Sequence, residues 1–250
     1  MARFVPTLFA SLFMIAASPA LATGSSPAAT STASTCKPPS TMKLNESGEG
    51  FADPDLAIGQ LSACLSRWAD APADVRAYTL EMRAVAYGQK EDYAHAIADR
   101  EESLRLAPAR TAWDIIALAR AYRGGGQPER AVELLRKMLQ DKMGLDGKGT
   151  TPGMPSYYHL GRALIDVQQW SSAADAFSEG LTYQQEYVWA YAYRSVAYDR
   201  LGRPERARAD IDKARSLIGR SNPLAREEYR QIVQKPPFVE LLKKYPEQGK

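Results

Sequence analysis

Residues 157–181 read YYHLGRALIDVQQWSSAADAFSEGL. Large apolar side chains recur in this stretch at helical spacing, at Tyr157, Leu160, Leu164, Phe177 and Leu181. The polar run DVQQW at 166–170 interrupts that spacing, so the stretch predicts a helix, a short turn and a second helix. Two packed helices approach to about 8 to 10 Å only where the side chains between them are small, and we expect Gly161 to face Ala173 there.

The same frame recurs four times along the chain. Four large residues, spaced 35, 42 and 34 positions apart, are each followed nine positions later by an alanine. The pairs are Tyr87 with Ala96, Tyr122 with Ala131, Leu164 with Ala173, and Tyr198 with Ala207. A repeat of about 34 residues with a turn in its middle predicts stacked helix pairs, because one pair cannot cover its own apolar face. An insertion at 143–155 lengthens the second spacing and could be a lid or a passive loop.

This pattern resembles the tetratricopeptide repeat, whose signature is W-x2-L-G-x2-Y followed by A-x3-F and P. The third copy matches it through Tyr157, Leu160, Gly161, Leu164, Ala173 and Phe177. The first copy departs from it at Arg83 and Arg100, which replace apolar residues. The resemblance implies an all-α, right-handed α-solenoid of about four helix-turn-helix units, with an N-terminal half-unit and C-terminal capping helices. We expect this solenoid over 54–250, with units at 77–110, 112–143, 154–187 and 188–219 and then the cap.

The N-terminus has the features of a secretory signal peptide. Arg3 precedes an apolar run, and Ala20-Leu21-Ala22 forms a small-x-small cleavage site, so we expect residues 1–22 to be removed. A transmembrane anchor is the alternative, but the run is shorter than the roughly 20 residues that span a bilayer. Residues 23–53 are rich in Ser, Thr, Ala and Pro and predict a disordered tether. A periplasmic or secreted protein follows, with no membrane span after cleavage.

The chain has two cysteines, Cys36 and Cys64. In an exported protein a bridge between them would tie the tether to the first helix. The alternative is a buried Cys64 and a free thiol at Cys36.

Composition argues against several functions. The formal charge of +3 on 250 residues offers no strong attraction to nucleic acid. The two histidines, His95 and His159, lack the spacing of a metal site, and the segment GLDGKGTT at 144–151 lacks the Ser or Thr that a phosphate loop needs after its lysine. We therefore expect no metal, no cofactor and no enzymatic activity.

The resemblance also implies where a ligand would bind, because in this family the first helices of successive units line a concave face. The candidate peptide-binding residues are Tyr78, Trp113, Arg120, Arg123, Tyr158, Arg162, Trp189 and Arg200. Arg120 and Arg162 share one register position in adjacent units and could together bind a carboxylate. Alternatively, the tryptophans pack as core and the arginines pair with Glu81, Asp166 or Asp199 across the face.

The favoured interpretation is a non-enzymatic interaction module, a scaffold or adaptor that holds an extended or C-terminal peptide segment of another protein. The alternative is a structural subunit of a cell-envelope assembly or secretion complex, which contacts its neighbours through its convex face and ends.

Overall fold

The computed structural model describes residues 42–45, 50–67, 70–109, 111–145 and 152–247. Eleven α-helices and one isolated β-bridge make up the regular structure of this described part, so the all-α fold is confirmed. The chain divides into two compact units, at 1–108 and 109–250. The predicted signal peptide lies outside the described residues, as do most of the tether and the centre of the insertion.

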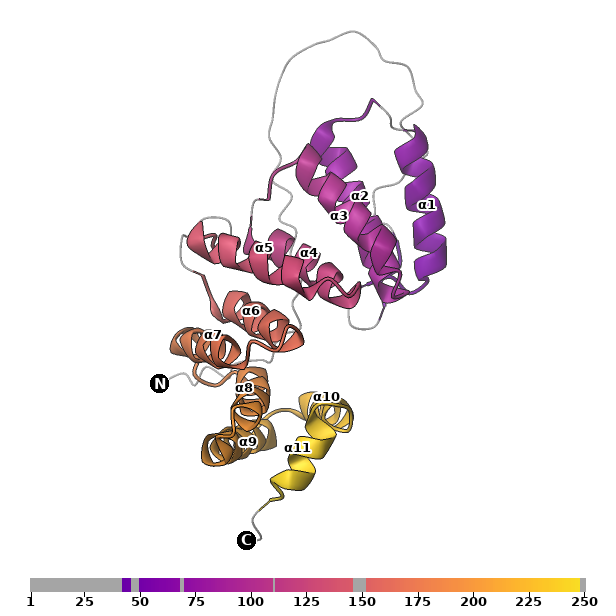
Figure 1. The fold of residues 1–250 in the computed structure, drawn as a ribbon. Coiled ribbons are helices and arrows are strands. Elements are labelled where there is room, and N and C mark those ends of the chain that lie inside the picture. The colour runs from indigo at the N-terminus through magenta and orange to yellow at the C-terminus, as the bar shows by residue number, and fades with distance from the viewer. Residues whose placement is uncertain (1–41, 46–49, 68–69, 110, 146–151, 248–250) are drawn as a thin grey trace, which may run out of the picture. The chain divides into compact units, whose positions relative to one another are not determined.

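The first unit holds three helices in its described part (Figure 1). They are α1 (Pro54–Arg67), α2 (Ala73–Gln89) and α3 (Tyr93–Leu106). Helices α2 and α3 pack as a pair, and α1 packs on α2 as the second helix of a half-unit would.

The second unit continues the pattern with three helix pairs and two further helices (Figure 1). They are α4 (Ala112–Gly124), α5 (Pro128–Gln140), α6 (Met154–Asp166), α7 (Trp170–Tyr183), α8 (Val188–Arg200), α9 (Pro204–Gly219), α10 (Pro223–Val233) and α11 (Phe238–Lys244). Helices α4, α6 and α8 are the first helices of successive pairs, and each packs on the next. Residues 157–181 therefore form helix, turn and helix, as the sequence predicts.

All four pairs turn in the same way. The residue at one register position has a positive φ in every pair: Glu91 at 58°, Gly126 at 72°, Gln168 at 59° and Gly202 at 67°. The amide of the next residue donates to a carbonyl five positions back, which belongs to the large residue of each repeat: Tyr87, Tyr122, Leu164 or Tyr198. This hydrogen bond is the one that closes a helix in the Schellman motif, so the repeat extends to the backbone of its turns.

Small residues allow the helices of a pair to approach, but the contact at Gly161 differs from the expected one. A Cβ atom at Gly161 would lie 2.6 Å from the ring of Phe177, so Phe177 and not Ala173 faces this glycine. The ring is 0% exposed and fills the space that a smaller residue would leave open. The alanines that recur once in each repeat are buried, with exposed fractions of 0 or 1%: Ala96, Ala131, Ala173 and Ala207.

Part of the predicted tether is ordered. Leu44 and Phe51 form an antiparallel bridge, and the Phe51 side chain is only 3% exposed. Both backbone groups of Phe51 bind the Gln89 amide of α2, at 2.8 Å from Phe51 N to Oε1 and at 3.0 Å from Nε2 to Phe51 O. The ring packs with Ala57, Leu61 and Ala86 in one apolar cluster. Composition suggested disorder because this segment is polar overall, and a single buried aromatic residue with matched hydrogen bonds is enough to fix it.

Candidate functional site

The eight residues predicted to bind a peptide all lie on first helices. Tyr78 is on α2, Trp113, Arg120 and Arg123 are on α4, Tyr158 and Arg162 are on α6, and Trp189 and Arg200 are on α8. Tyr78 belongs to the first unit, and the other seven belong to the second. We use the name first-helix face for the surface formed by α4, α6 and α8 in the second unit, which pack in that order.

Arg162 occupies the centre of this face, held by tyrosines. Its Nη1 donates to the Tyr158 hydroxyl at 2.9 Å, and its guanidinium lies 4.0 Å from the ring centroid of Tyr193. Burial alone would lower the pKa of Arg162, but its contacts with the two tyrosines outweigh burial and the pKa is raised. The group is therefore a fixed cation that is partly shielded from water, where charge interactions are stronger than in bulk solvent.

The carboxylates that could neutralise the two matched arginines are bound by other cations. Asp166 accepts from Arg123 Nε at 2.5 Å, and Asp199 accepts from Lys244 Nζ at 2.6 Å. The charge of Asp166 still helps to raise the pKa of Arg162, but among the described residues Arg162 has no ion pair or hydrogen bond to a carboxylate. Exposed Arg120 has neither an ion pair nor a hydrogen bond in the same part of the chain. Glu81, the third acid considered from sequence, pairs with Arg100 in the first unit.

His159 adds a buried ring beside these cations. Its ring meets that of Tyr158 edge-on at 5.1 Å, and its Nδ1 is buried with no hydrogen-bond partner among the described residues. Burial lowers the pKa of His159 well below 6.5, and the charges of Arg120, Arg123 and Arg162 lower it further. A neutral imidazole next to three guanidinium groups marks a positive region in which an anion would be stabilised.

Aromatic rings surround the cations. Tyr158 lies 5.3 Å from Tyr187 and 5.9 Å from Tyr193 between ring centroids, both edge-on. Burial raises the pKa of Tyr193 to about 12, so the phenol stays neutral at physiological pH. Sequence reasoning did not select Tyr187, Tyr193 or His159, because none stands at a concave position of the family's register.

The remaining predicted residues of the second unit are Trp189, Arg200 and Trp113. The Trp189 ring packs on Tyr229 of α10 at 5.4 Å and on Phe238 of α11 at 6.5 Å, close to the core-packing alternative. The guanidinium of Arg200 lies 5.8 Å from the Trp170 ring of α7. Trp113 lies in the first turn of α4, where the Thr111 amide donates to Asp114 Oδ2 at 3.0 Å and fixes the helix start.

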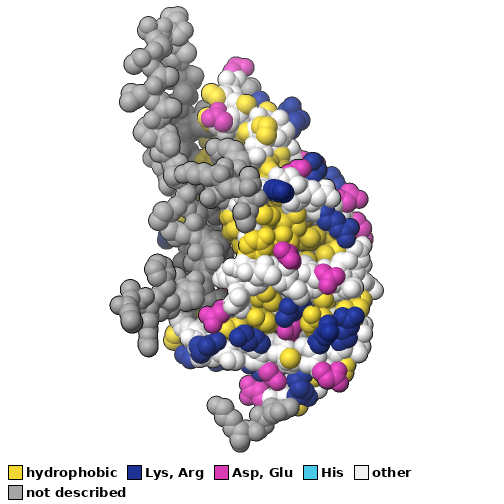
Figure 2. All heavy atoms as spheres, turned by 90° about the vertical axis from the view of Figure 1, so that its left-hand side faces the viewer, with side chains coloured by type: hydrophobic (Ala, Val, Ile, Leu, Met, Phe, Trp, Pro, Cys, Tyr) yellow, Lys and Arg dark blue, Asp and Glu magenta, His cyan; other side chains and the backbone are white. Residues whose placement is uncertain are grey.

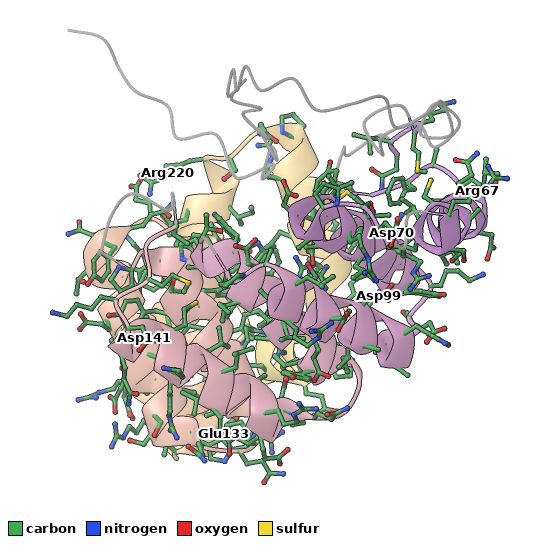
Figure 3. All side chains as sticks on the ribbon, turned by 90° about the horizontal axis from the view of Figure 1, so that it is seen from above. Arg67, Asp70, Asp99, Glu133, Asp141 and Arg220 are labelled. Atoms are coloured by element: carbon green, nitrogen blue, oxygen red, sulfur yellow. The ribbon has the colours of Figure 1, made fainter. Side chains whose placement is uncertain are left out.

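Some acids and bases elsewhere hold the two helices of a pair together. In the first unit, Arg83 binds both oxygens of Asp99 at 2.7 Å, and Figure 3 shows Asp99 among the side chains of that unit. Glu133 and Asp141 lie at the outer edge of the same view. On the face in Figure 2, basic side chains alternate with acidic ones and with hydrophobic patches, so no single-sign surface appears there.

Three further expectations concern single features. Cys64 is buried on α1 and is not a free thiol, but Cys36 lies outside the described residues, so the bridge between them stays a prediction. Within the described ranges there is no group of three or more His, Cys, Asp or Glu residues that could hold a metal ion. None of the helices described is both long enough and apolar enough to cross a membrane.

Comparison with known proteins shows the fold. No model of a known protein family matches the sequence, and neither does any curated protein. Among solved structures, MamA has a TM-score of 0.54 at 19% identity, covering 66% of this chain and 82% of that chain. YrrB, described as a TPR protein with an unusual peptide-binding site, has a TM-score of 0.52 at 17% identity, covering 71% and 84%. Nearly identical TPR-like repeats from Podosopora anserina reach 0.55 at 19%, covering 66% and 86%. The chain therefore has a tetratricopeptide-repeat fold.

Proposed function

We propose that this protein is a non-enzymatic interaction scaffold that holds an extended segment of another protein on the first-helix face. The observation that carries the proposal is the pair Arg120 and Arg162, which stand on α4 and α6 without a carboxylate partner among the described residues. The peptide-binding site of YrrB, a protein of the same fold, supports a peptide as the ligand class.

The chemistry of the face favours an acidic or C-terminal carboxylate. Guanidinium groups bind carboxylates with two donors in one plane, and each hydrogen bond to a charged group contributes about 1.5 to 3 kcal/mol. Arg162 is held in place by Tyr158 before any ligand arrives, so little side-chain entropy is lost on binding. The nearby rings of Tyr158 and Tyr187 offer apolar area for the residue next to the carboxylate.

The flanking segments narrow the surface that a ligand can use. Phe51 and Gln89 cover part of α2 in the first unit, and α11 packs on α8 in the second. The first helices that carry the two matched arginines are α4 and α6. We place the peptide there, with its carboxylate between Arg120 and Arg162.

A peptide library with free C-termini, and the same library amidated, tests the proposal. We expect the best free-acid peptides to lose at least tenfold in affinity when amidated and on the double change Arg120→Ala/Arg162→Ala. The matched control is Arg203→Ala/Arg226→Ala, which removes two exposed charges elsewhere on the second unit. Unchanged affinity in the first double variant, with helix content intact, would contradict the proposal and favour the assembly-subunit alternative.

The same proposal places the mature protein outside the cytoplasm, in the periplasm or the medium. Its support is the signal-peptide pattern of residues 1–22. N-terminal sequencing of the protein from its native cell is expected to begin at Thr23. A chain that begins at Met1 or Ala2 would contradict export by this signal.

A further inference from the structure

The last helix of the chain lies on the first-helix face. The Phe238 ring of α11 meets the Tyr193 ring of α8 edge-on at 4.8 Å and is 2% exposed. Three residues further on, Leu241 is 6% exposed. Leu241 and Val196 line a hollow of about 190 Å³ between α11 and α8. Two apolar side chains on one side of a short helix thus hold it to α8.

A polar contact completes the attachment. Asp199 of α8 accepts from Lys244 Nζ at 2.6 Å and from the Tyr245 hydroxyl at 2.7 Å. The Tyr245 ring is buried, and the guanidinium of Arg208 on α9 lies 5.4 Å from its centroid. The end of α11 is therefore fixed by charge and hydrogen bonds, whereas its start is fixed by apolar contact.

The position of α11 in the repeat is that of a ligand. Besides Tyr193, the residues of α8 that it touches or faces are Trp189, Val196, Asp199 and Arg200. These four share register positions with Trp113, Arg120, Arg123 and Gly124 of α4. Helix α10 packs on α9, as the first helix of a following repeat would. The second helix of such a repeat would pack on its own partner alone, but α11 extends onto α8.

We propose that this face of α8 is a binding site for an amphipathic helix, and that α11 is its resident occupant. The other ligand is a partner helix with the same anchors: an aromatic residue, a leucine three positions later, and a lysine and tyrosine at six and seven positions. The site lies on α8 and the proposed carboxylate site on α4 and α6, with Tyr193 in contact with both Phe238 and the Arg162 guanidinium. The helix site would remain if the carboxylate site bound nothing.

The size of α11 makes exchange feasible. A seven-residue helix is marginal by itself in water, so its own affinity for α8 is low. Its attachment through 234–237 raises the local concentration to the order of millimolar, which is what keeps it bound. A longer partner helix with the same anchors buries more area and loses less on ordering, so it can displace α11 at modest concentration.

The test uses the full-length chain and a labelled peptide with the sequence of residues 234–247, QKPPFVELLKKYPE. In the double variant Phe238→Ala/Leu241→Ala the attached helix loses its anchors while α8 is unchanged. We expect this variant to bind the peptide at least tenfold more tightly than wild type, as measured by fluorescence anisotropy. The control Lys243→Ala, which changes an exposed position of α11 outside the hollow, should bind as wild type does.

Further variants distinguish a binding site on α8 from a purely structural role of α11. Adding Asp199→Asn to the released variant should weaken peptide binding several-fold, and Arg120→Ala, which changes an exposed arginine of α4, should leave it unchanged. Equal, weak binding by the released variant and wild type, with helix content intact, would overturn the proposal. If the released variant loses helix content, Lys244→Ala/Tyr245→Phe replaces it, and no gain in peptide binding there would overturn the proposal too. A stable wild-type dimer that excludes the peptide would overturn it in favour of α11 exchange between copies.

Discussion

Gln168 sits in a backbone conformation that its side chain disfavours. Its φ of 59° lies in the left-handed region, which costs a non-glycine residue about 1 to 2 kcal/mol. Gly126 and Gly202 fill the equivalent position in the second and fourth repeats. We expect Gln168→Gly to raise the free energy of unfolding by about 1 kcal/mol in a urea titration, after the added chain entropy of glycine is subtracted.

Ala209→Gly is the control for that change, since Ala209 is an exposed residue in the interior of helix α9. Glycine there is expected to lower the free energy of unfolding, by up to about 1 kcal/mol. A loss of stability in both variants would show that the turn at Gln168 is not strained.

His159 makes the stability of the second unit depend on pH. Its pKa in the folded chain is well below 6.5, because of burial and then the neighbouring arginines. Below about pH 6.5 the unfolded chain binds a proton that the folded chain does not, so stability falls as the pH falls. We expect a slope approaching about 1.4 kcal/mol per pH unit between pH 6 and pH 5, and a smaller slope in His159→Phe.

Carboxylates also change the free energy of unfolding as the pH falls. The quantity that reports on His159 is therefore the difference in slope between wild type and His159→Phe. His95→Gln is the matched control, because His95 is exposed and pairs with Asp92 on the surface. A slope lost equally in both variants would assign the effect to histidines in general and not to the buried ring.

Helix pairs of the first and fourth repeats share an ion pair that the middle repeats lack. Arg194 binds both oxygens of Asp210 at 2.8 Å and Ser178 of the preceding pair at 2.9 Å. In the first repeat Arg83, Asp99 and Ser62 make the equivalent contacts at equivalent positions. The third repeat has Leu160 and Ala176 instead. The Arg-Asp pair therefore replaces an apolar contact within an unchanged frame.

The apolar residues of the third repeat predict what happens when the ion pair between α8 and α9 is replaced. Arg194→Leu alone leaves Asp210 buried without its partner, which costs about 3 to 5 kcal/mol. Adding Asp210→Ala copies the third repeat and should recover most of that loss, as measured by thermal unfolding of the second unit. If the double variant is no more stable than the single one, the pair is specific to its surroundings and the two repeats are not interchangeable.

The helix pairs could be predicted because small and large residues alternate at fixed spacings that only two packed helices satisfy. The contact between Gly161 and Phe177 could not, since spacing fixes which residues face inward but not which atom fills each gap. Arg120 and Arg162 were found because they share a register position. His159 and Tyr193 were not, because their place beside Arg162 depends on how neighbouring helices pack. The position of α11 was equally hidden, since seven residues outside the repeat carry no register.

At the scale of the whole molecule, each terminal segment covers a first helix of its own unit. Phe51 and its hydrogen bonds to Gln89 fix the N-terminal segment on α2, and α11 does the same on α8. Such segments shield apolar surface that a neighbouring repeat would cover in a longer array. Neither segment carries the two matched arginines of the proposed peptide site, which stand on α4 and α6.

A substitution at Phe51 tests whether a loss of stability in the first unit affects peptide binding on the second unit. Phe51→Ala removes a ring that is 3% exposed and should cost about 3 to 5 kcal/mol, seen as faster amide hydrogen exchange in α1 and α2. Because Arg120, Arg162 and Tyr158 all belong to the second unit, affinity for a free-acid peptide should not change. Tyr158→Phe is the reciprocal variant: it removes the hydroxyl that orients Arg162, and should weaken the peptide while exchange in α2 stays as in wild type. Weaker peptide binding in Phe51→Ala would mean that the ligand also contacts the first unit, and would enlarge the proposed site to include α2 and its predicted residue Tyr78.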